Sequence, residues 1–308
     1  MQNLSHETPP VPPAAQPGSS LTLALNAAEA RLQICAADAR GNMVFAQSWN
    51  APSQGVELLT PALADALRRS GHTPADIARI ACVRGPGSFT GLRLALVTAS
   101  GLSRASGALM AGLDYLPLLA VNAFAAMRCG RNAADETPSP LWVVTHARRN
   151  LVHAQAFAPE SAETGCEADA PAGQDTLPRV RALSALLVLN INDPAPENCL
   201  TSHVAALGGH PVFVGSGATR NRDELAASLA AAGIEYSAAG PAYDHPSLET
   251  LCQASLRAAY SHEDPQALYA RPCDAEENLP RIAAKLGLDP AEARKRLDAL
   301  TRGVTICE

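Results

Sequence analysis

The sequence predicts an α/β protein with two lobes, each with the element order βββαβα. Three observations lead to this fold class. Near the start, Leu21, Leu23 and Leu25 alternate with small or polar neighbours, which is the period of a strand. A short apolar run at 79–83 is followed by a glycine-rich turn and then by a long segment without proline. A similar order of strands and helices recurs after residue 140.

The first lobe begins with three expected strands, at residues 21–26, 32–36 and 43–49. The short turn at 38–42 favours an antiparallel meander. An amphipathic helix follows, in which Pro61 is tolerable only near the first turn. Its apolar face and its capping glycine are Val56, Leu59, Leu63, Ala66, Leu67 and Gly71. The run Thr73-Pro74-Ala75-Asp76 has the composition of a helix cap.

Residues 84–93 read Arg-Gly-Pro-Gly-Ser-Phe-Thr-Gly-Leu-Arg. The chain must turn sharply here, because glycine allows positive φ and proline fixes its own φ. Ser88 or Thr90 can cap the helix expected over 92–105. A glycine loop before a helix can also cradle phosphate with its amide groups, although no GK[ST] follows and a purely structural turn is the alternative. The candidate phosphate residues are Gly85, Gly87, Ser88 and Thr90.

Small residues recur at every fourth position of this helix, and positions four apart share one face. These residues are Gly91, Ala95, Ala99, Ser103 and Gly107. Such a face would let another helix approach closely, as small residues do between membrane helices. The alternative is that the face packs inside its own lobe.

The second lobe is expected to contain strands at 141–145, 150–157 and 211–214, then Gly215-Ser216-Gly217 and helices at 222–232 and 247–260. Residues 159–178 and 190–209 are interpreted as loop insertions, and 277–303 as two short helices. The predicted organisation is a disordered leader (1–20), an N-terminal lobe (21–118), a C-terminal lobe (119–275) and a helical tail (276–308). Two βββαβα units in tandem suggest the actin/Hsp70/sugar-kinase superfold.

Composition excludes several classes of protein. With 47% apolar and 18% charged residues, the 308-residue chain can build a sizeable core, and it has no apolar run long enough to span a membrane. A net charge of −6 does not suit a protein that grips phosphate backbones by itself. The start has no secretory signal. Eight scattered cysteines without a CxxC pattern indicate reduced thiols in the cytoplasm.

Residues that could carry chemistry are few. Asn26 stands at the end of the first strand, where this superfold often has an aspartate for metal and phosphate, but a turn-forming role is the simpler interpretation. His146 and His153 fall on different expected strands, and no HxxxH or HExxH occurs, so no metal site is predicted. Arg93 could meet a partner's carboxylate or cover its own helix. No catalytic set is evident.

Residues 84–93 closely resemble the signature of the bacterial TsaB (YeaZ) family, which is related to glycoprotease-like peptidases. Weaker similarities support the match: Leu58-Leu59 with Pro61 resembles the family's LLP helix, Ala147-Arg148-Arg149 its DAR strand end, and Tyr269-Ala270-Arg271-Pro272 its YxRP segment. The leader, the insertions and the tail after about residue 276 are not covered.

This resemblance implies a non-catalytic, cofactor-free subunit in threonylcarbamoyladenosine formation on tRNA. It implies that the chain pairs with TsaD, which carries the metal and nucleotide, and works with the ATPase TsaE; tRNA is met only through the complex, and a homodimer is the other pairing. The implied contact helices contain Leu59, Leu63, Gly91, Ala95, Ala99 and Ser103.

Three departures from the family pattern bear on function. The family usually has Asp at the positions of Asn26 and His146, and His-Ser at Gln54-Gly55. Each change removes a polar group that nucleotide chemistry would use and leaves an interface role intact. The rival hypotheses are a glycoprotease-like metallopeptidase or ATP-dependent enzyme of the same superfold, and a homodimeric module with another partner.

Overall fold

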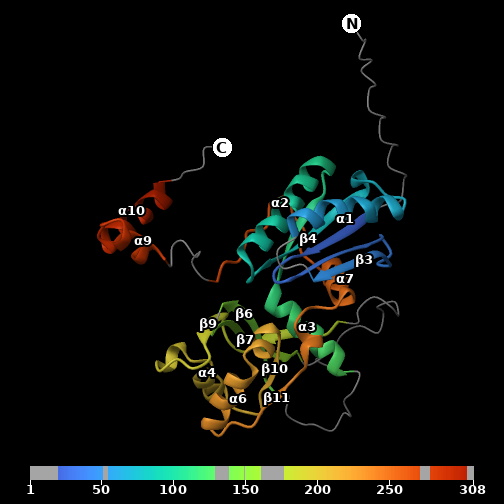
Figure 1. Cartoon of the computed structure of the whole chain (residues 1–308). Helices are drawn as coiled ribbons and strands as arrows, with labels where there is room; N and C mark the ends of the chain where they lie inside the picture. Colours follow the sequence, from blue (N-terminus) through green and yellow to red (C-terminus); the bar gives the residue numbers. More distant parts are fainter. Residues whose placement is uncertain are drawn as a thin grey trace. The chain divides into compact units, whose positions relative to one another are not determined.

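The computed structural model describes residues 20–50, 55–128, 139–148, 150–160, 177–270 and 278–303. It divides into two compact units, residues 1–268 and 269–308, which are considered separately below. The first unit contains two β-sheets with helices, and the second contains two helices (Figure 1). The predicted leader up to residue 19 and residues 161–176 of the predicted insertion lie outside the described residues.

The first sheet has the strand order β3-β2-β1-β4-β5. Its strands are β1 (Leu21–Asn26), β2 (Arg31–Ala37), β3 (Met43–Asn50), β4 (Ile77–Gly85) and β5 (Leu109–Asp114). The predicted antiparallel meander is confirmed, since β1 pairs with β2 and β2 with β3 in opposite directions. Strands β4 and β5 extend the sheet in parallel to β1. The sequence pattern had not revealed β5.

Helices α1 (Gly55–Arg69) and α2 (Phe89–Ser106) contribute to the core on one side of this sheet. Two expectations for α1 are wrong. Val56 is 63% exposed and so does not belong to the buried face, and Pro61 is the seventh helical residue and not part of the first turn. The cap before β4 is as predicted: the Asp76 carboxylate accepts from the Thr73 amide at 2.7 Å and opens the short helix η1 (Pro74–Asp76).

The second sheet repeats this arrangement, with the order β11-β10-β6-β7-β8 and with β9 also paired to β7. Its strands are β6 (Leu141–Arg148), β7 (Leu151–Pro159), β8 (Val180–Ala182), β9 (Leu187–Asn190), β10 (Val212–Val214) and β11 (Ser237–Ala238). Strand β6 is antiparallel to β7 and parallel to β10, just as β1 is to β2 and β4. The chain therefore has the predicted two-lobed actin/Hsp70/sugar-kinase-like fold with two mixed sheets.

Two helices join the cores of the sheets. Helix α3 (Tyr115–Arg128) contacts strands of both sheets, and α7 (Leu248–Leu256) packs against β1 and β2 although it follows the second sheet in the chain. One buried cluster accordingly includes residues of both sheets and of both helices. Helix α3 was not predicted, and the boundary proposed at residue 118 falls within it. Helix α7 ends at Leu256, before the predicted end at residue 260.

The other side of the second sheet carries α4 (Leu200–Leu207), α5 (Ser216–Arg220) and α6 (Arg222–Ala231), with the short helices η2 (Pro196–Asn198) and η3 (Pro241–Tyr243) nearby in the chain. The interpretation of residues 190–209 as a loop insertion is wrong, because they contain α4. Leu200 and Val204 have helical spacing, and both are buried in the core of this lobe.

The second unit contains α9 (Leu279–Lys285) and α10 (Pro290–Gly303), which confirms the two short helices predicted there. The Asp289 carboxylate accepts from the Glu292 amide at 3.0 Å and caps α10, as the Asp-Pro-Ala-Glu run indicates. In the part of the chain that the structure describes, no helix is both long and apolar enough to cross a membrane.

Candidate functional site

The glycine loop after β4 packs against the turn between β1 and β2. Ser88 donates its amide to the Ala28 carbonyl at 2.6 Å, and its hydroxyl accepts from the Gly91 amide at 3.3 Å as the predicted cap. A Cβ atom on Gly87 would lie 2.1 Å from the Ala28 oxygen, and one on Gly91 would lie 2.0 Å from the Ala27 oxygen. These glycines are therefore required for a close backbone approach, whatever else the loop binds.

The second lobe repeats this contact. Gly215, with a φ of +100°, and Gly217 follow β10 and pack against the middle of β6. A Cβ on Gly215 would lie 2.5 Å from the Val144 oxygen, and one on Gly217 would lie 2.8 Å from the Thr145 carbonyl carbon. In each lobe, glycines that follow one strand thus pack closely against the backbone of its parallel neighbour or of the turn after that neighbour.

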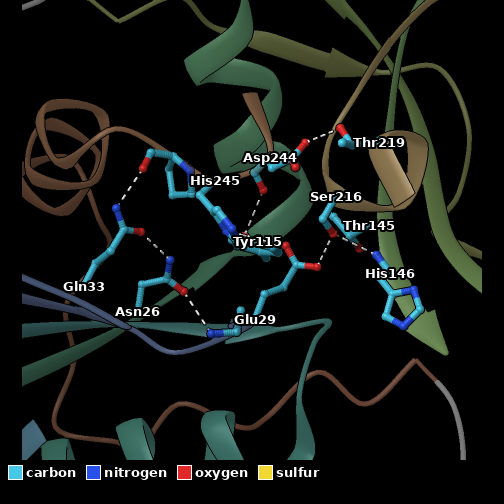
Figure 2. Close-up of polar contacts among 12 residues, drawn as sticks. Asn26, Glu29, Gln33, Tyr115, Thr145, His146, Ser216, Thr219, Asp244 and His245 are labelled. Atoms are coloured by element: carbon cyan, nitrogen blue, oxygen red, sulfur yellow. Dashed lines mark hydrogen bonds and ion pairs between the residues drawn. The ribbon is translucent and has the colours of Figure 1, made fainter. Parts of the chain in front are cut away.

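Polar side chains from both lobes converge on Glu29, in the turn between β1 and β2 (Figure 2). Its side chain is only 8% exposed. The Ser216 hydroxyl, at the start of α5, donates to Oε1, and the Tyr115 hydroxyl, at the start of α3, donates to Oε2 at 2.9 Å. His245 Nδ1 lies 3.2 Å from the Tyr115 oxygen and 3.7 Å from Glu29 Oε2. We call Glu29, Tyr115, Ser216 and His245 the Glu29 cluster.

A second layer of hydrogen bonds surrounds the Glu29 cluster. The His146 amide donates to the Ser216 oxygen at 3.1 Å, so this hydroxyl both accepts and donates. The Thr219 hydroxyl donates to Asp244 Oδ1 at 2.6 Å. The segment that precedes α7 is thereby held beside α5, and Asp244 itself is directed away from Glu29.

Burial dominates the electrostatics of the Glu29 cluster. Burial raises the pKa of Glu29, while the hydrogen bonds from Ser216 and Tyr115 and the positive charge of Arg220 lower it. Burial, together with the charges of Arg31 and Arg220, lowers the pKa of His245 to about 4. His245 is therefore neutral at pH 7, and the Tyr115 oxygen can accept from its Nδ1 while the Tyr115 proton goes to Glu29.

Asn26 holds the same turn from its other side. Its Oδ1 accepts from the Ala28 amide at 3.0 Å, and its Nδ2 donates to Gln33 Oε1 at 2.8 Å. Gln33 in turn donates to the Pro246 carbonyl at 2.8 Å (Figure 2). The turn-forming interpretation of Asn26 is confirmed by its bond to Ala28.

Most of the residues expected to contact a partner are buried in their own lobe. Ala95 and Ala99 have no exposed surface, and Leu59 and Leu63 pack in the same cluster between the helices and the first sheet. Ser103 donates to the Ala108 carbonyl at 2.6 Å. While the lobe is folded, the four buried side chains cannot touch a partner. Ala95 and Ala99 position α2 on its own sheet, because small residues allow close packing, and Leu59 and Leu63 pack α1 into the same cluster.

A different row of residues on α2 faces outward. We call it the exposed α2 stripe; its members, four residues apart, are Phe89, Arg93, Val97, Gly101 and Ala105. Val97 is 70% exposed and Phe89 is 41% exposed. The guanidinium carbon of Arg93 lies 3.9 Å from the centre of the Phe89 ring, so Arg93 covers its own helix in the isolated chain.

Comparison with known proteins shows which family has this architecture. The family model TsaD, described as tRNA N6-adenosine threonylcarbamoyltransferase, matches residues 50–273, well over half of the chain. The chain belongs to this family. The protein described as tRNA threonylcarbamoyladenosine biosynthesis protein TsaB of Escherichia coli strain K12 is 36% identical over 73 residues, which span 24% of this chain and 32% of that protein.

Solved structures agree in fold. The structure described as YeaZ from Pseudomonas aeruginosa has a TM-score of 0.55 and 18% identity over 82% of this chain and all of that chain. A second Pseudomonas aeruginosa structure, described as similar to peptidase YEAZ, gives the same values. The family-model match and the similarity to the protein described as TsaB confirm the resemblance to the TsaB (YeaZ) family that residues 84–93 indicated, and these structures agree with it in fold.

Sequence reasoning missed the Glu29 cluster apart from noting Ser216 in its glycine turn. Glu29 stands in an alanine-rich turn, and an acidic residue three positions after the end of a buried strand is the only signal it offers. Among the described residues, no group of three or more His, Cys, Asp or Glu side chains could hold a metal ion. His153 is buried on β7, with Nδ1 3.5 Å from the Thr145 hydroxyl.

Proposed function

We propose that the chain is a non-catalytic cytoplasmic subunit that binds and stabilises a TsaD-type subunit during threonylcarbamoyladenosine formation on tRNA. Membership of the family and similarity to a protein described as TsaB support this role. The observation that carries the proposal is the exposed α2 stripe, an apolar face on the helix opened by the family signature.

The side chains of the exposed α2 stripe are of the kinds that pack against a helix of another subunit. Val97 and Phe89 offer apolar area whose burial would drive association, and Arg93 can leave the Phe89 ring to meet a carboxylate at the rim. Gly101 and Ala105 would let a second helix approach closely at the other end of the stripe. The buried small residues beneath keep α2 in place, so the surface is pre-organised for binding.

The Glu29 cluster also supports a non-catalytic role. The carboxyl of Glu29 is committed to two hydroxyl donors, and the Ser216 hydroxyl is engaged on both sides. A residue that performs acid–base or nucleophilic chemistry needs access to a substrate. In this chain these groups instead join the two lobes.

The test is a reconstituted transfer reaction with the TsaD-type and TsaE-type proteins of the same organism, a threonylcarbamoyl donor and unmodified tRNA. Modified adenosine is measured by mass spectrometry after digestion of the tRNA. We expect modification to depend on this chain, and the chain without the TsaD-type protein to produce none. Modification by the chain alone, or full modification in its absence, would refute the proposal. A homodimer or a TsaE contact through the same stripe would appear as complexes that form without the TsaD-type protein.

A further inference from the structure

We propose that Glu29 is an internal ligand, a carboxyl that fills a small oxyanion site which the two lobes build between them. The site takes a free carboxylate of acetate size when the Glu29 side chain is shortened to its Cβ. This assignment is independent of the proposed subunit role, because it concerns only how the lobes of this chain are held together.

The geometry of the donors carries the inference. The hydroxyls of Ser216 and Tyr115 belong to helices of different parts of the chain, and each directs its proton at a different oxygen of one carboxyl. Ser216 and Tyr115 are 3% and 0% exposed, so neither hydroxyl has water as an alternative partner. A pair of buried donors aimed at both oxygens of a carboxyl is the arrangement of a carboxylate-binding site.

The charges around the site are mixed. Arg220 and Arg31 lie close enough to act on Glu29, Asp244 or His245, and they favour an anion. The carboxylate of Asp244 repels a second negative charge nearby, but its Oδ1 accepts a hydrogen bond from the Thr219 hydroxyl. His245 is the remaining titratable group beside Tyr115, and it is neutral near pH 7. Burial opposes the charged form, so the donors and the arginines must offset that cost for any anion that binds.

The internal ligand has a structural consequence. Glu29 is held in the turn of the first sheet by Asn26 and the glycine loop, whereas Ser216 belongs to the second lobe. Their hydrogen bond therefore joins the two lobes through a carboxyl group that belongs to the chain and cannot dissociate as a bound small molecule would. A protein organised in this way keeps its lobes joined without a bound small molecule.

Chemical complementation tests the proposal. Glu29→Ala keeps the Cβ atom and removes Cγ with the carboxyl group, a fragment of the size of acetate. Melting temperatures are measured in sodium acetate and in sodium chloride of equal ionic strength at pH 7, for the full-length protein and its variants. For Glu29→Ala we expect a saturable rise of about 3–6 °C at ten times the dissociation constant of acetate. Wild type and Glu29→Gln, whose side chains fill the site, should show no difference between the salts.

Two controls separate the oxyanion site from other causes. Acetamide has the shape of acetate without its charge, so an equal effect of acetamide would overturn the oxyanion assignment. The double variant Glu29→Ala/Ser216→Ala lacks one donor and should lose most of the response to acetate. If Glu29→Ala does not fold in chloride, the yield of folded protein in each salt replaces the melting temperature. No response of Glu29→Ala to acetate, or an equal response of wild type, would refute the proposal.

Discussion

Two glycines of the same helix should respond in opposite ways to the same substitution. A Cβ on Gly91 would lie 2.0 Å from the backbone oxygen of Ala27, whereas one on Gly101 would have no atom within 4 Å. In Gly91→Ala the turn between β1 and β2 must move away from α2 by about 1.4 Å to reach an ordinary contact. Gly101→Ala requires no movement.

The magnitude follows from what the movement breaks. Overpacking in a well-packed region costs about 1–3 kcal/mol, and loss of the hydrogen bond from Ser88 to Ala28 costs about 1 kcal/mol more. We therefore expect Gly91→Ala to lower the free energy of unfolding by about 2–4 kcal/mol. Gly101→Ala should raise it by about 0.5–1 kcal/mol, because alanine is the better helix former at an exposed site.

Urea denaturation followed by circular dichroism measures both variants beside wild type. The same movement would displace Glu29, so Gly91→Ala should also expose the segment at 27–30 to hydrogen exchange while Gly101→Ala does not. Equal stability of the two variants would refute the claim that the glycine loop exists for this close approach. So would a stability of Gly91→Ala above that of wild type.

Two further predictions concern the core of the first lobe and the pH dependence of the free energy of unfolding. Leu59→Ala should lower the free energy of unfolding by about 2–4 kcal/mol, because Leu59 is fully buried, and Leu58→Ala, at a half-buried position, should cost less in the same urea assay. The pKa of His245 is lowered from 6.5 to about 4 in the folded chain. Between these two pH values the unfolded chain binds a proton at His245 and the folded chain does not, so the free energy of unfolding falls as the pH falls. His245→Gln should lose about 3 kcal/mol of this pH dependence between pH 7 and pH 4, and urea unfolding at both pH values would show an unchanged dependence if the reasoning is wrong.

Much of the fold could be predicted from alternation and from glycine positions. The strands around Leu23 and the turn after β4 were found because period-two patterns and glycine with proline restrict the backbone directly. The segment from 107 to 128 was missed because it is apolar almost throughout, with Pro117 in its middle. An apolar run of this kind does not distinguish a buried strand from a buried helix, and here it contains β5 followed directly by α3.

The functional surfaces were harder to predict, for a geometric reason. On opposite sides of α2, two rows consist largely of small or apolar residues, one through Ala95 and one through Val97, and only the first packs on the lobe's own sheet. The sequence cannot show which row the sheet covers, since that depends on β1 and β4. The Glu29 cluster combines residues more than 200 positions apart, and no local pattern links Glu29 to His245.

The most direct test of the proposed role is the affinity of this chain for the TsaD-type protein of the same organism, measured by titration calorimetry with light scattering. Val97→Glu removes exposed apolar area and would bury an unpaired carboxylate in the contact, and we expect it to weaken binding at least about 100-fold without loss of stability. Leu207→Glu, an exposed apolar position on α4, should bind like wild type. Wild-type affinity of Val97→Glu, or no complex with wild type, would contradict the account.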